Sequence, residues 1–306
     1  MLDTIRAVQI YPSHIRIETN DKDTKVLFGI NDENFQDLIN GGSRNIVETR
    51  NHKKLGTVRS PYTVTNSDGY DNKVPLNEFD RAVLSACISE WRAGNPYITP
   101  AMIFRSITGK VGTIGNKIRA NQEKDISDSI EKLMFTNFNR DNQRSLEQLR
   151  YCEGDDEIKI KSAAILPAVV VDVKINGQLI ENAIFFTCES PVLTVADQKN
   201  QIVRYDVELL NVPNQNNTLL VISLKNYVMR RICEIKLHKN LARTLTWDNI
   251  FHKCRISDAN DKTKHDARAT VIKLFENLLN KGFIKSFTLA KKFPDSKRSY
   301  GISFTF

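Results

Sequence analysis

The C-terminal stretch carries the clearest hydrophobic pattern in the chain. Apolar residues recur there at three- and four-residue intervals, as Val271, Leu274 and Leu278 show. This spacing predicts an amphipathic helix over 265–283 that packs on one broad side. Gly282 is expected to end this helix in a left-handed conformation.

Two stretches of alternating apolar and polar residues follow, 283–289 and 299–304, and predict two strands. The segment between them is basic and contains turn residues. Upstream, apolar spacing over 226–239 predicts a first helix, and a threonine cap predicts a short second helix over 246–251. Three helices followed by a strand pair with a basic tip are typical of a winged helix, which is the fold expected for residues 212–306.

The same order of elements is expected once earlier in the chain. Apolar spacing predicts helices over 79–91 and 121–135, and a Thr99–Pro100 start predicts another helix between them. Apolar runs on both sides of Asn176-Gly177 predict a hairpin, because Asn-Gly is the strongest short hairpin signal. The expected fold class is therefore α+β, with two winged-helix domains in tandem, each with three helices and a β-hairpin wing, and residues 74–211 form the first.

The remaining segments carry weaker patterns. Residues 1–73 are expected to be an N-terminal extension with short strands over 7–17 and 24–30. From 41 to 73 the composition turns to Gly, Asn, Ser and scattered basic residues, which indicates either an arm along phosphates or a solvated linker. An apolar run over 218–224 is expected to be a strand that opens the second domain.

Composition narrows the class of protein. The chain has 306 residues and 41% hydrophobic residues, enough for two cores. No apolar run is long enough to span a bilayer and no signal peptide is recognised, so a cytoplasmic protein is expected. Five cysteines without CxxC spacing argue against a disulfide scaffold and against a cysteine zinc site. No cofactor and no metal is predicted.

Charge is distributed unevenly. Residues 225–306 contain eighteen Lys+Arg and seven Asp+Glu, a net charge of +11, whereas the whole chain is +8 and the remainder is therefore −3. One interpretation of this charge is a helix-plus-hairpin module whose basic face is only solvated. A basic excess confined to one small helix-and-wing domain instead favours a nucleic acid as partner.

The predicted DNA-binding residues lie on the last helix and on the loop after it. Five residues are expected in the major groove: Lys262, Lys264, His265, Arg268 and Lys273. Arg268 also borders the apolar stripe and could cover the core with its stem instead. The loop residues are expected on the DNA backbone or in the minor groove: Lys291, Lys292, Lys297 and Arg298.

Three stretches resemble replication initiators of iteron-bearing plasmids and related initiators of phages and mobile elements. They are Asn77-Glu78-Phe79-Asp80 with Ile98-Thr99-Pro100, then the helix around 126–133, and finally residues 200–232. The third stretch also resembles proteins of Gram-positive mobile elements. The resemblance implies that the C-terminal domain grips a DNA repeat in the major groove, and that the first domain adds contacts and mediates dimers. The helix over 121–135 departs from this pattern because it is acidic, so dimerisation is its alternative role.

The function expected from these patterns is sequence-specific binding to repeats at an origin of replication. The partners are double-stranded DNA carrying direct repeats or an operator, with a homodimer and host replication proteins as further candidates. A transcriptional repressor with the same fold remains the alternative, since both classes dock alike. An enzyme is not expected. A DNA-nicking initiator or relaxase needs paired metal-binding histidines, whereas the five histidines of this chain lie far apart. Gly109-Lys110 also lacks the residues that a phosphate-binding loop requires.

Overall fold

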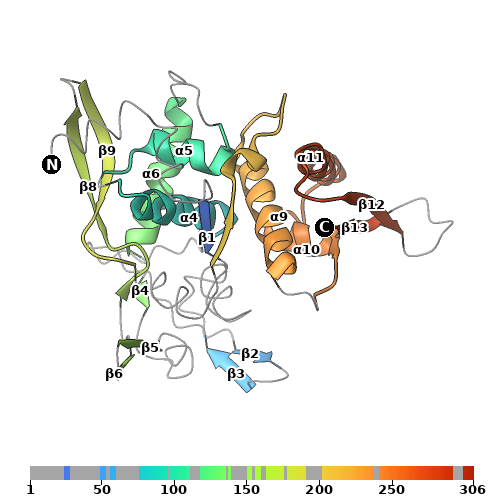
Figure 1. The fold of residues 1–306 in the computed structure, drawn as a ribbon, viewed down its shortest axis with the longest axis horizontal. Coiled ribbons are helices and arrows are strands. Elements are labelled where there is room, and N and C mark those ends of the chain that lie inside the picture. The colour runs from blue at the N-terminus through green and yellow to red at the C-terminus, as the bar shows by residue number, and fades with distance from the viewer. Residues whose placement is uncertain are drawn as a thin grey trace.

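A computed structural model describes two helix-and-strand units and several short strand pairs (Figure 1). The described residues are 76–95, 97–110, 118–135, 163–175, 178–190, 202–237, 241–291 and 299–306, with the short strands 24–27, 49–52, 56–59, 137–138, 150–153 and 156–159. Helices and small antiparallel sheets are mixed along the chain, so the fold class is α+β.

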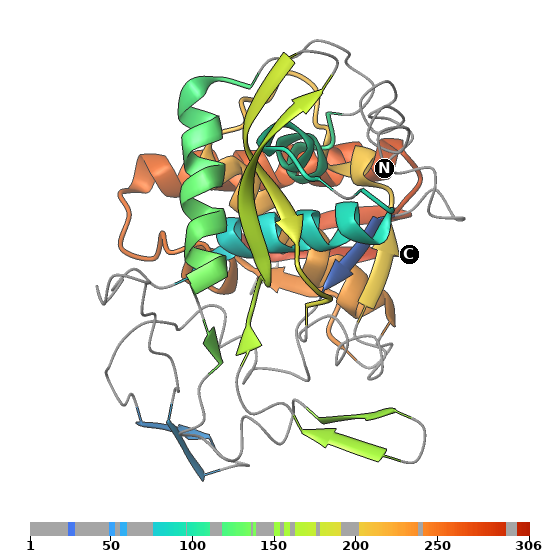
Figure 2. The same cartoon turned by 90° about the vertical axis from the view of Figure 1, so that its left-hand side faces the viewer.

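The first unit consists of three helices and a hairpin. The helices are α4 (Glu78–Arg92), α5 (Pro100–Thr108) and α6 (Ala120–Phe135). The hairpin pairs β8 (Ala168–Ile175) with β9 (Gln178–Phe186). Figure 2 shows α6 standing beside α4, with the hairpin crossing in front of them.

The second unit has the same order of elements. Its helices are α9 (Leu219–Leu237), α10 (Trp247–Lys253) and α11 (Asp261–Asn280). A sheet of order β11-β13-β12 completes it; the strands are β11 (Thr244–Thr246), β12 (Ser286–Lys291) and β13 (Ser299–Thr305).

Shorter elements surround the two units. The 3-10 helix η1 (Val207–Leu210) precedes α9, and β10 (Ile202–Tyr205) pairs with β1 (Thr24–Leu27). The other pairs are β2 (Thr49–His52) with β3 (Gly56–Arg59), β4 (Asn137–Phe138) with β7 (Ala163–Ala164), and β5 (Arg150–Glu153) with β6 (Asp156–Lys159).

Local sequence signals explain where the helices of the first unit begin and end. The Asn77 side chain accepts hydrogen bonds from the backbone N–H groups of Phe79 and Asp80, and the Asp80 carboxylate accepts one from the Asn77 backbone N–H, which forms a capping box. Thr99 caps α5, and Pro100 supplies its first residue. Gly94 has a φ of +90° after α4, a left-handed conformation that glycine adopts without a steric penalty.

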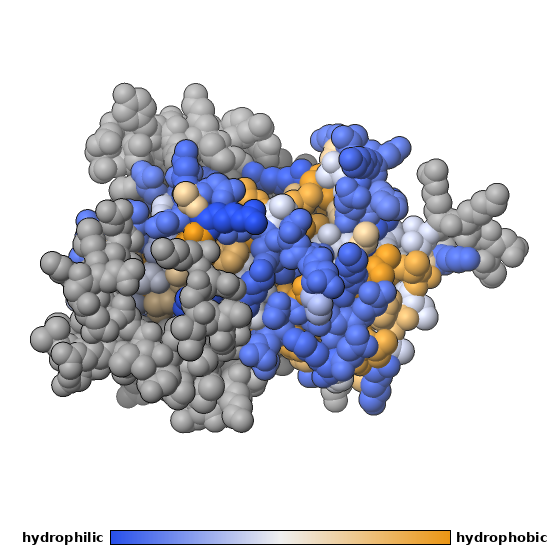
Figure 3. Space-filling model, turned by 90° about the horizontal axis from the view of Figure 1, so that it is seen from above, coloured by the Kyte–Doolittle hydropathy of each residue, from blue (hydrophilic) through white to orange (hydrophobic). Residues whose placement is uncertain are grey.

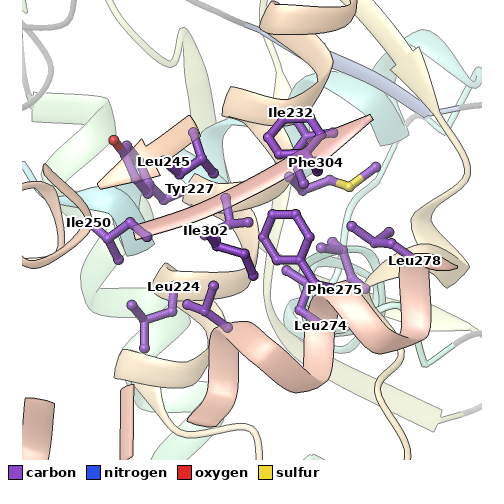
Figure 4. Close-up of a cluster of buried hydrophobic side chains, with 14 of the residues drawn as sticks. Leu224, Tyr227, Ile232, Leu245, Ile250, Leu274, Phe275, Leu278, Ile302 and Phe304 are labelled. Atoms are coloured by element: carbon purple, nitrogen blue, oxygen red, sulfur yellow. The ribbon is translucent and has the colours of Figure 1, made fainter. Parts of the chain in front are cut away.

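Each unit has its own hydrophobic core. The first contains Val83, Leu84, Ile103 and Ile130, all 2% exposed or less. Figure 4 shows part of the second, in which Phe275 of α11 faces Ile302 and Phe304 of β13. Full burial of one such side chain stabilises the fold by roughly 1.5–3 kcal/mol. Helices and strands whose spacing places apolar residues on one side are therefore favoured.

The two units also share an arrangement of paired strands. Ile98 and Val170 both pair with Ile184 of β9, so a short strand segment before α5 joins the last strand of its unit. In the second unit Leu245 of β11 and Leu289 of β12 pair in the same way with Ile302 of β13. A strand ahead of the second helix therefore pairs with the last strand in both units.

The third helices match in the same way. Residues Ile126, Ser129, Ile130 and Leu133 of α6 are buried. The buried residues of α11 at the same spacing are Ala267, Thr270, Val271 and Leu274. Both helices thus place a small hydroxyl residue at the second position of an otherwise apolar stripe.

Most predicted elements are present, and some predictions were wrong in detail. The segment 218–224 is not a strand; α9 begins at Leu219, because its apolar residues are buried on more than one side and lack the alternation of a half-exposed strand. The predicted arm contains the hairpin β2–β3. The last helix begins at Asp261, ahead of the predicted start, because Asn260 caps it. The predicted strand over 7–17 lies outside the described residues.

The glycine that ends α5 contacts the segment that contains η1. Gly109 ends α5 with a φ of +72° and is buried against η1. A Cβ there would lie 2.4 Å from the Val207 carbonyl oxygen and 2.6 Å from the Asn211 nitrogen. Both the backbone conformation and the space therefore require glycine at this position.

We expect Gly109→Ala to lower the free energy of unfolding far more than Gly282→Ala. Gly282 has a φ of +69° but no neighbour within 4 Å of its would-be Cβ, so alanine there costs only about 1–2 kcal/mol of backbone strain. At Gly109 the clash with backbone adds about 1–3 kcal/mol. Urea unfolding of the two variants measures the difference; equal losses would mean that the α5–η1 contact yields at no cost.

A buried lysine predicts the pH dependence of stability. Lys225 is 1% exposed, and its ammonium donates hydrogen bonds to the Leu210 carbonyl oxygen and the Asn217 side chain, each at 2.9 Å. Burial lowers the pKa of Lys225 to about 7. Between this value and the ordinary 10.5, the unfolded chain binds a proton that the folded chain does not.

The contribution of Lys225 to stability therefore rises as the pH rises from 7 to 9, by up to roughly 1.4 kcal/mol per pH unit. We expect Lys225→Met to flatten the dependence, and Lys285→Met, which removes an exposed lysine, to leave it unchanged. Urea unfolding at pH 7, 8 and 9 checks this. A wild-type slope that persists in Lys225→Met would assign the titration to another group.

Candidate nucleic-acid interface

The third helix of the second unit begins at a well-formed cap. The Asn260 side chain accepts a hydrogen bond of 2.8 Å from the Thr263 backbone N–H. Because the cap satisfies an otherwise free N–H, the first turns of α11 can remain at the surface. The buried stripe that begins at Ala267 anchors the rest of the helix to the core.

The opposite side of α11 forms an exposed stripe. Its members recur at three- and four-residue spacing and are fully or half exposed: Lys262, His265, Asp266, Ala269, Lys273 and Glu276. Ala269 at the centre leaves room for a close approach, and the larger side chains flank it. Figure 3, which looks down on this side of the molecule, shows a largely hydrophilic surface over the described part of the second unit.

The predicted helix residues fall into two groups. Lys262, His265 and Lys273 are exposed on the stripe, and Lys264 is half exposed beside it. Arg268 differs, because its guanidinium carbon lies 5.2 Å from the centre of the Phe251 ring. This cation–π contact ties Arg268 to α10, and the half-exposed side chain remains a candidate for either a DNA contact or a cover of the core.

The wing is described only in part. Lys291 is exposed at the end of β12, whereas Lys292, Lys297 and Arg298 lie outside the described residues. Tyr300, 45% exposed at the start of β13, stands beside this end of the ribbon and was missed by the sequence analysis. Strand alternation would place Tyr300 on the same face as the buried Ile302 and Phe304, so the pattern of 299–304 carried no signal of its exposure. Its hydroxyl can donate to a phosphate oxygen.

Acidic residues temper the positive charge of this surface. Asp266 is exposed on the stripe, with its carboxylate oxygen 3.5 Å from His265 Nδ1, and Glu276 lies further along. The basic residues gather toward the first half of α11 and the wing. The surface is therefore suited to an anion that lies along the first turns of the helix and the ribbon.

The first unit has an exposed helix end in the matching place. At the start of α6 the residues Arg119, Asn121 and Lys124 are exposed. When the buried stripes of the two third helices are aligned, Asn121 corresponds to Lys262 and Lys124 to His265. The sequence analysis missed these residues because it took the acidic character of the helix as a whole.

Two of the acidic residues of α6 face the junction between the units. Asp125 and Asp128 line a cavity of about 350 Å³ together with Leu219 of α9 and Lys253 and Arg255 after α10. Burial, followed by the neighbouring Asp128, raises the pKa of Asp125. Asp125 and Asp128 follow Asn121 by four and seven residues, so the acidic wall continues the face of α6 that begins at its exposed first turn.

Asp80 borders the same cavity and is fully buried. Its carboxylate accepts a hydrogen bond of 2.7 Å from Ser129 and lies 3.7 Å from the Lys132 ammonium. Burial raises the pKa of Asp80, although Lys132 and the hydrogen bonds act in the opposite direction. These contacts hold α4 on α6, and the positive charge of Arg255 from the second unit also favours the ionised form of Asp80.

The described part of the chain contains no group of three or more His, Cys, Asp or Glu side chains placed to hold a metal ion. None of its helices has the length and apolar character needed to cross a bilayer.

Comparison of the chain with protein-family models, with curated proteins and with solved structures gives no match.

Proposed function

We propose that the chain is a sequence-specific double-stranded DNA-binding protein that initiates replication of a plasmid or another mobile element by binding repeats at an origin. Binding, rather than catalysis, is the activity proposed. The observation that carries the proposal is the exposed stripe of α11, which begins at a capped helix end and presents Lys262, His265 and Lys273 around the small Ala269. A helix with this layout fits a major groove and can reach base edges with its first turns.

The proposed architecture is a tandem of two winged-helix domains. Three features support it: the same element order in both units, the strand that precedes the second helix and pairs with the last strand, and the matching buried stripes of α6 and α11. In the second domain the ribbon β12–β13 would be the wing. Its basic loop residues would then contact phosphates, which fix register and carry no sequence information.

Both domains would contact DNA under this proposal. Asn121 and Lys124 occupy on α6 the places that Lys262 and His265 occupy on α11, with Arg119 just ahead of the helix, and an asparagine in such a place can pair with adenine. The second domain would contribute most of the affinity, because residues 225–306 carry the net charge of +11. A homodimer and contacts with host replication proteins belong to the same proposal.

Initiation and repression differ in the sites that are bound. A mobility-shift and footprinting experiment with DNA flanking the gene separates the two. Protection of a tandem array of repeats supports initiation, whereas protection of a single palindrome supports a transcriptional regulator of a mobile element or phage. Absence of any specific complex would remove both.

Binding should weaken steeply with salt. If about six basic groups of the helix and wing meet phosphates, log affinity should fall against log salt with a slope of roughly −5, since each contact releases about 0.9 counterion. Fluorescence anisotropy with labelled DNA at several salt concentrations measures this slope. A slope near zero would rule out the nucleic-acid assignment.

Lys262 and Arg268 should respond differently to replacement by alanine. Lys262 is exposed, so Lys262→Ala should reduce the free energy of cognate binding by about 1–3 kcal/mol and leave the melting temperature unchanged. Arg268→Ala should lower stability by roughly 0.5–1 kcal/mol, because it removes the contact with Phe251. Melting curves and binding to cognate and random DNA are measured on the same preparations. They distinguish a residue that contacts a base from one that shields the hydrophobic core. If Lys262→Ala weakened cognate and random DNA equally, Lys262 would be a phosphate contact.

A further inference from the structure

Helix α9 belongs to the cores of both units. Ile222 near its start packs in the first core, whereas Leu224 and Val228 pack in the second, and all three are 2% exposed or less. Figure 1 shows α9 between α4 of the first unit and α11 of the second. Movement of one unit against the other would therefore have to occur across α9.

A buried ion pair crosses the contact between α4 and α9. Arg230 of α9 donates a hydrogen bond of 2.8 Å from Nη2 to Glu78 Oε1, with the two side chains 3% and 2% exposed. Arg81, one turn after Glu78, is also 3% exposed. Arg231 and Glu234 pair with each other at the more exposed margin of this contact.

Arg81 and Arg230 are two buried like charges beside Glu78. Burial, followed by the like charge of Arg230, lowers the pKa of Arg81 to about 9, while Glu78 acts in the opposite direction. A buried ion pair is stable only in good geometry, because the desolvated charges lose their partner when they slide apart. The contact between α4 and α9 is thus restricted to a narrow range of positions.

A second tie connects the start of α11 to the first unit. Arg255, which lies between α10 and α11, donates a hydrogen bond of 2.8 Å to the Leu76 carbonyl oxygen, just ahead of α4. Its φ of +57° is unusual for a residue with a side chain, so the backbone is strained at Arg255 while the guanidinium contacts the first unit. Asn226 of α9 adds a hydrogen bond of 2.9 Å to the Ile107 carbonyl oxygen at the end of α5.

We propose that Glu78, Arg230 and Arg255 are positioning residues that fix α6 and α11 relative to each other, so that the chain accepts two DNA segments only at one spacing. The consequence for DNA rests on the proposed function, whereas the fixed geometry of the two helices does not. In Figure 2 the green α6 lies next to the orange turn that leads into α11. Asp125 of α6 and Arg255 of this turn line the same cavity. The two exposed helix ends therefore move together only as long as these ties hold.

The Arg230–Glu78 pair predicts opposite effects for two substitutions. Glu78→Gln removes the carboxylate that pairs with the buried Arg230, so the contact between α4 and α9 should loosen. Arg81→Met removes one of the like charges with an apolar side chain of similar length and leaves the Arg230–Glu78 pair intact, so the geometry should persist. Arg255→Gly deletes the second tie and at the same time relieves the left-handed strain.

Distances between the units in solution test the proposal without DNA. Spin labels are placed at Glu131 of α6 and Glu276 of α11, both exposed, in the full chain with Cys152 and Cys188 replaced by serine. The same background without the two introduced cysteines gives the labelling control. We expect one narrow distance distribution in the wild type and in Arg81→Met, and a clearly broadened one in Glu78→Gln and in Arg255→Gly.

Folding of each unit can be followed separately in these variants. The chain has two tryptophans: Trp91 packs against the first core, and Trp247 is buried in the second. Wild-type unfolding transitions in single-tryptophan versions show that both cores are intact while the distance changes. A broad distribution in the wild type, or one in Glu78→Gln as narrow as in the wild type, would overturn the positioning role.

The DNA consequence is measured on a bound site that is lengthened between the two contacted segments. Insertion of about 5 base pairs turns one segment to the other side of the duplex, since a helical turn takes about 10. Affinity of the wild type should fall by about tenfold or more, and affinity of Glu78→Gln by much less. Equal losses in both proteins would overturn the positioning role on DNA. Failure of the wild type to bind any DNA would overturn the proposed function alone, because the spin-label distances still decide the geometry.

Discussion

The packing of α9 between two hydrophobic cores is the constraint on which the rest of the structure depends. A helix that is buried on two sides cannot shift to improve one core without disturbing the other, because protein interiors are close-packed. Its first turns contribute Ile222 to the first core and its later turns contribute Val228 and Ile232 to the second. The linker ahead of it is held just as firmly, since Leu209 and Leu210 are buried and Gly109 lies directly against this segment.

Polar groups at this junction fix the relative positions of the helices, because apolar packing alone is not directional. Lys225 satisfies the Leu210 carbonyl group, Asn277 of α11 donates to the Leu209 carbonyl oxygen, and Arg230 pairs with Glu78. Each of these groups is costly to bury and is compensated only in one arrangement. The junction thus combines apolar area, which supplies stability, with buried hydrogen bonds and charges, which specify the geometry.

The exposed helix ends have the opposite character. The first turns of α6 and α11 carry long basic or amide side chains that are free of core packing, with the exception of Arg268, which covers Phe251. Such side chains cost little when they reorganise around an anionic partner. The proposed function therefore places adaptable contacts on a framework whose internal angles are set elsewhere.

The sequence by itself determined the helices and the hairpins, because these depend on local periodicity, caps and turn residues. The Asn77 and Thr99 caps, the stops at Gly94 and Gly282, and the hairpin around Asn176-Gly177 could all be predicted, since each acts within a few residues. The exposed positions of Lys262, His265 and Lys273 followed from the same helical spacing.

Only the tertiary structure decided what joins these elements. The pairing of Ile98 with Ile184, the burial of Lys225 and the Arg230–Glu78 pair connect residues far apart in the sequence, and no local pattern records such pairs. The run 218–224 was predicted as a strand because its apolar residues lack a one-sided pattern; the structure shows a helix buried on two sides. The location of the charges of α6 likewise depends on tertiary packing. Asp125 and Asp128 line the cavity, whereas Arg119 and Lys124 are exposed at the start of the helix. The sequence could not predict this, because the exposure of a charge depends on what packs beside it.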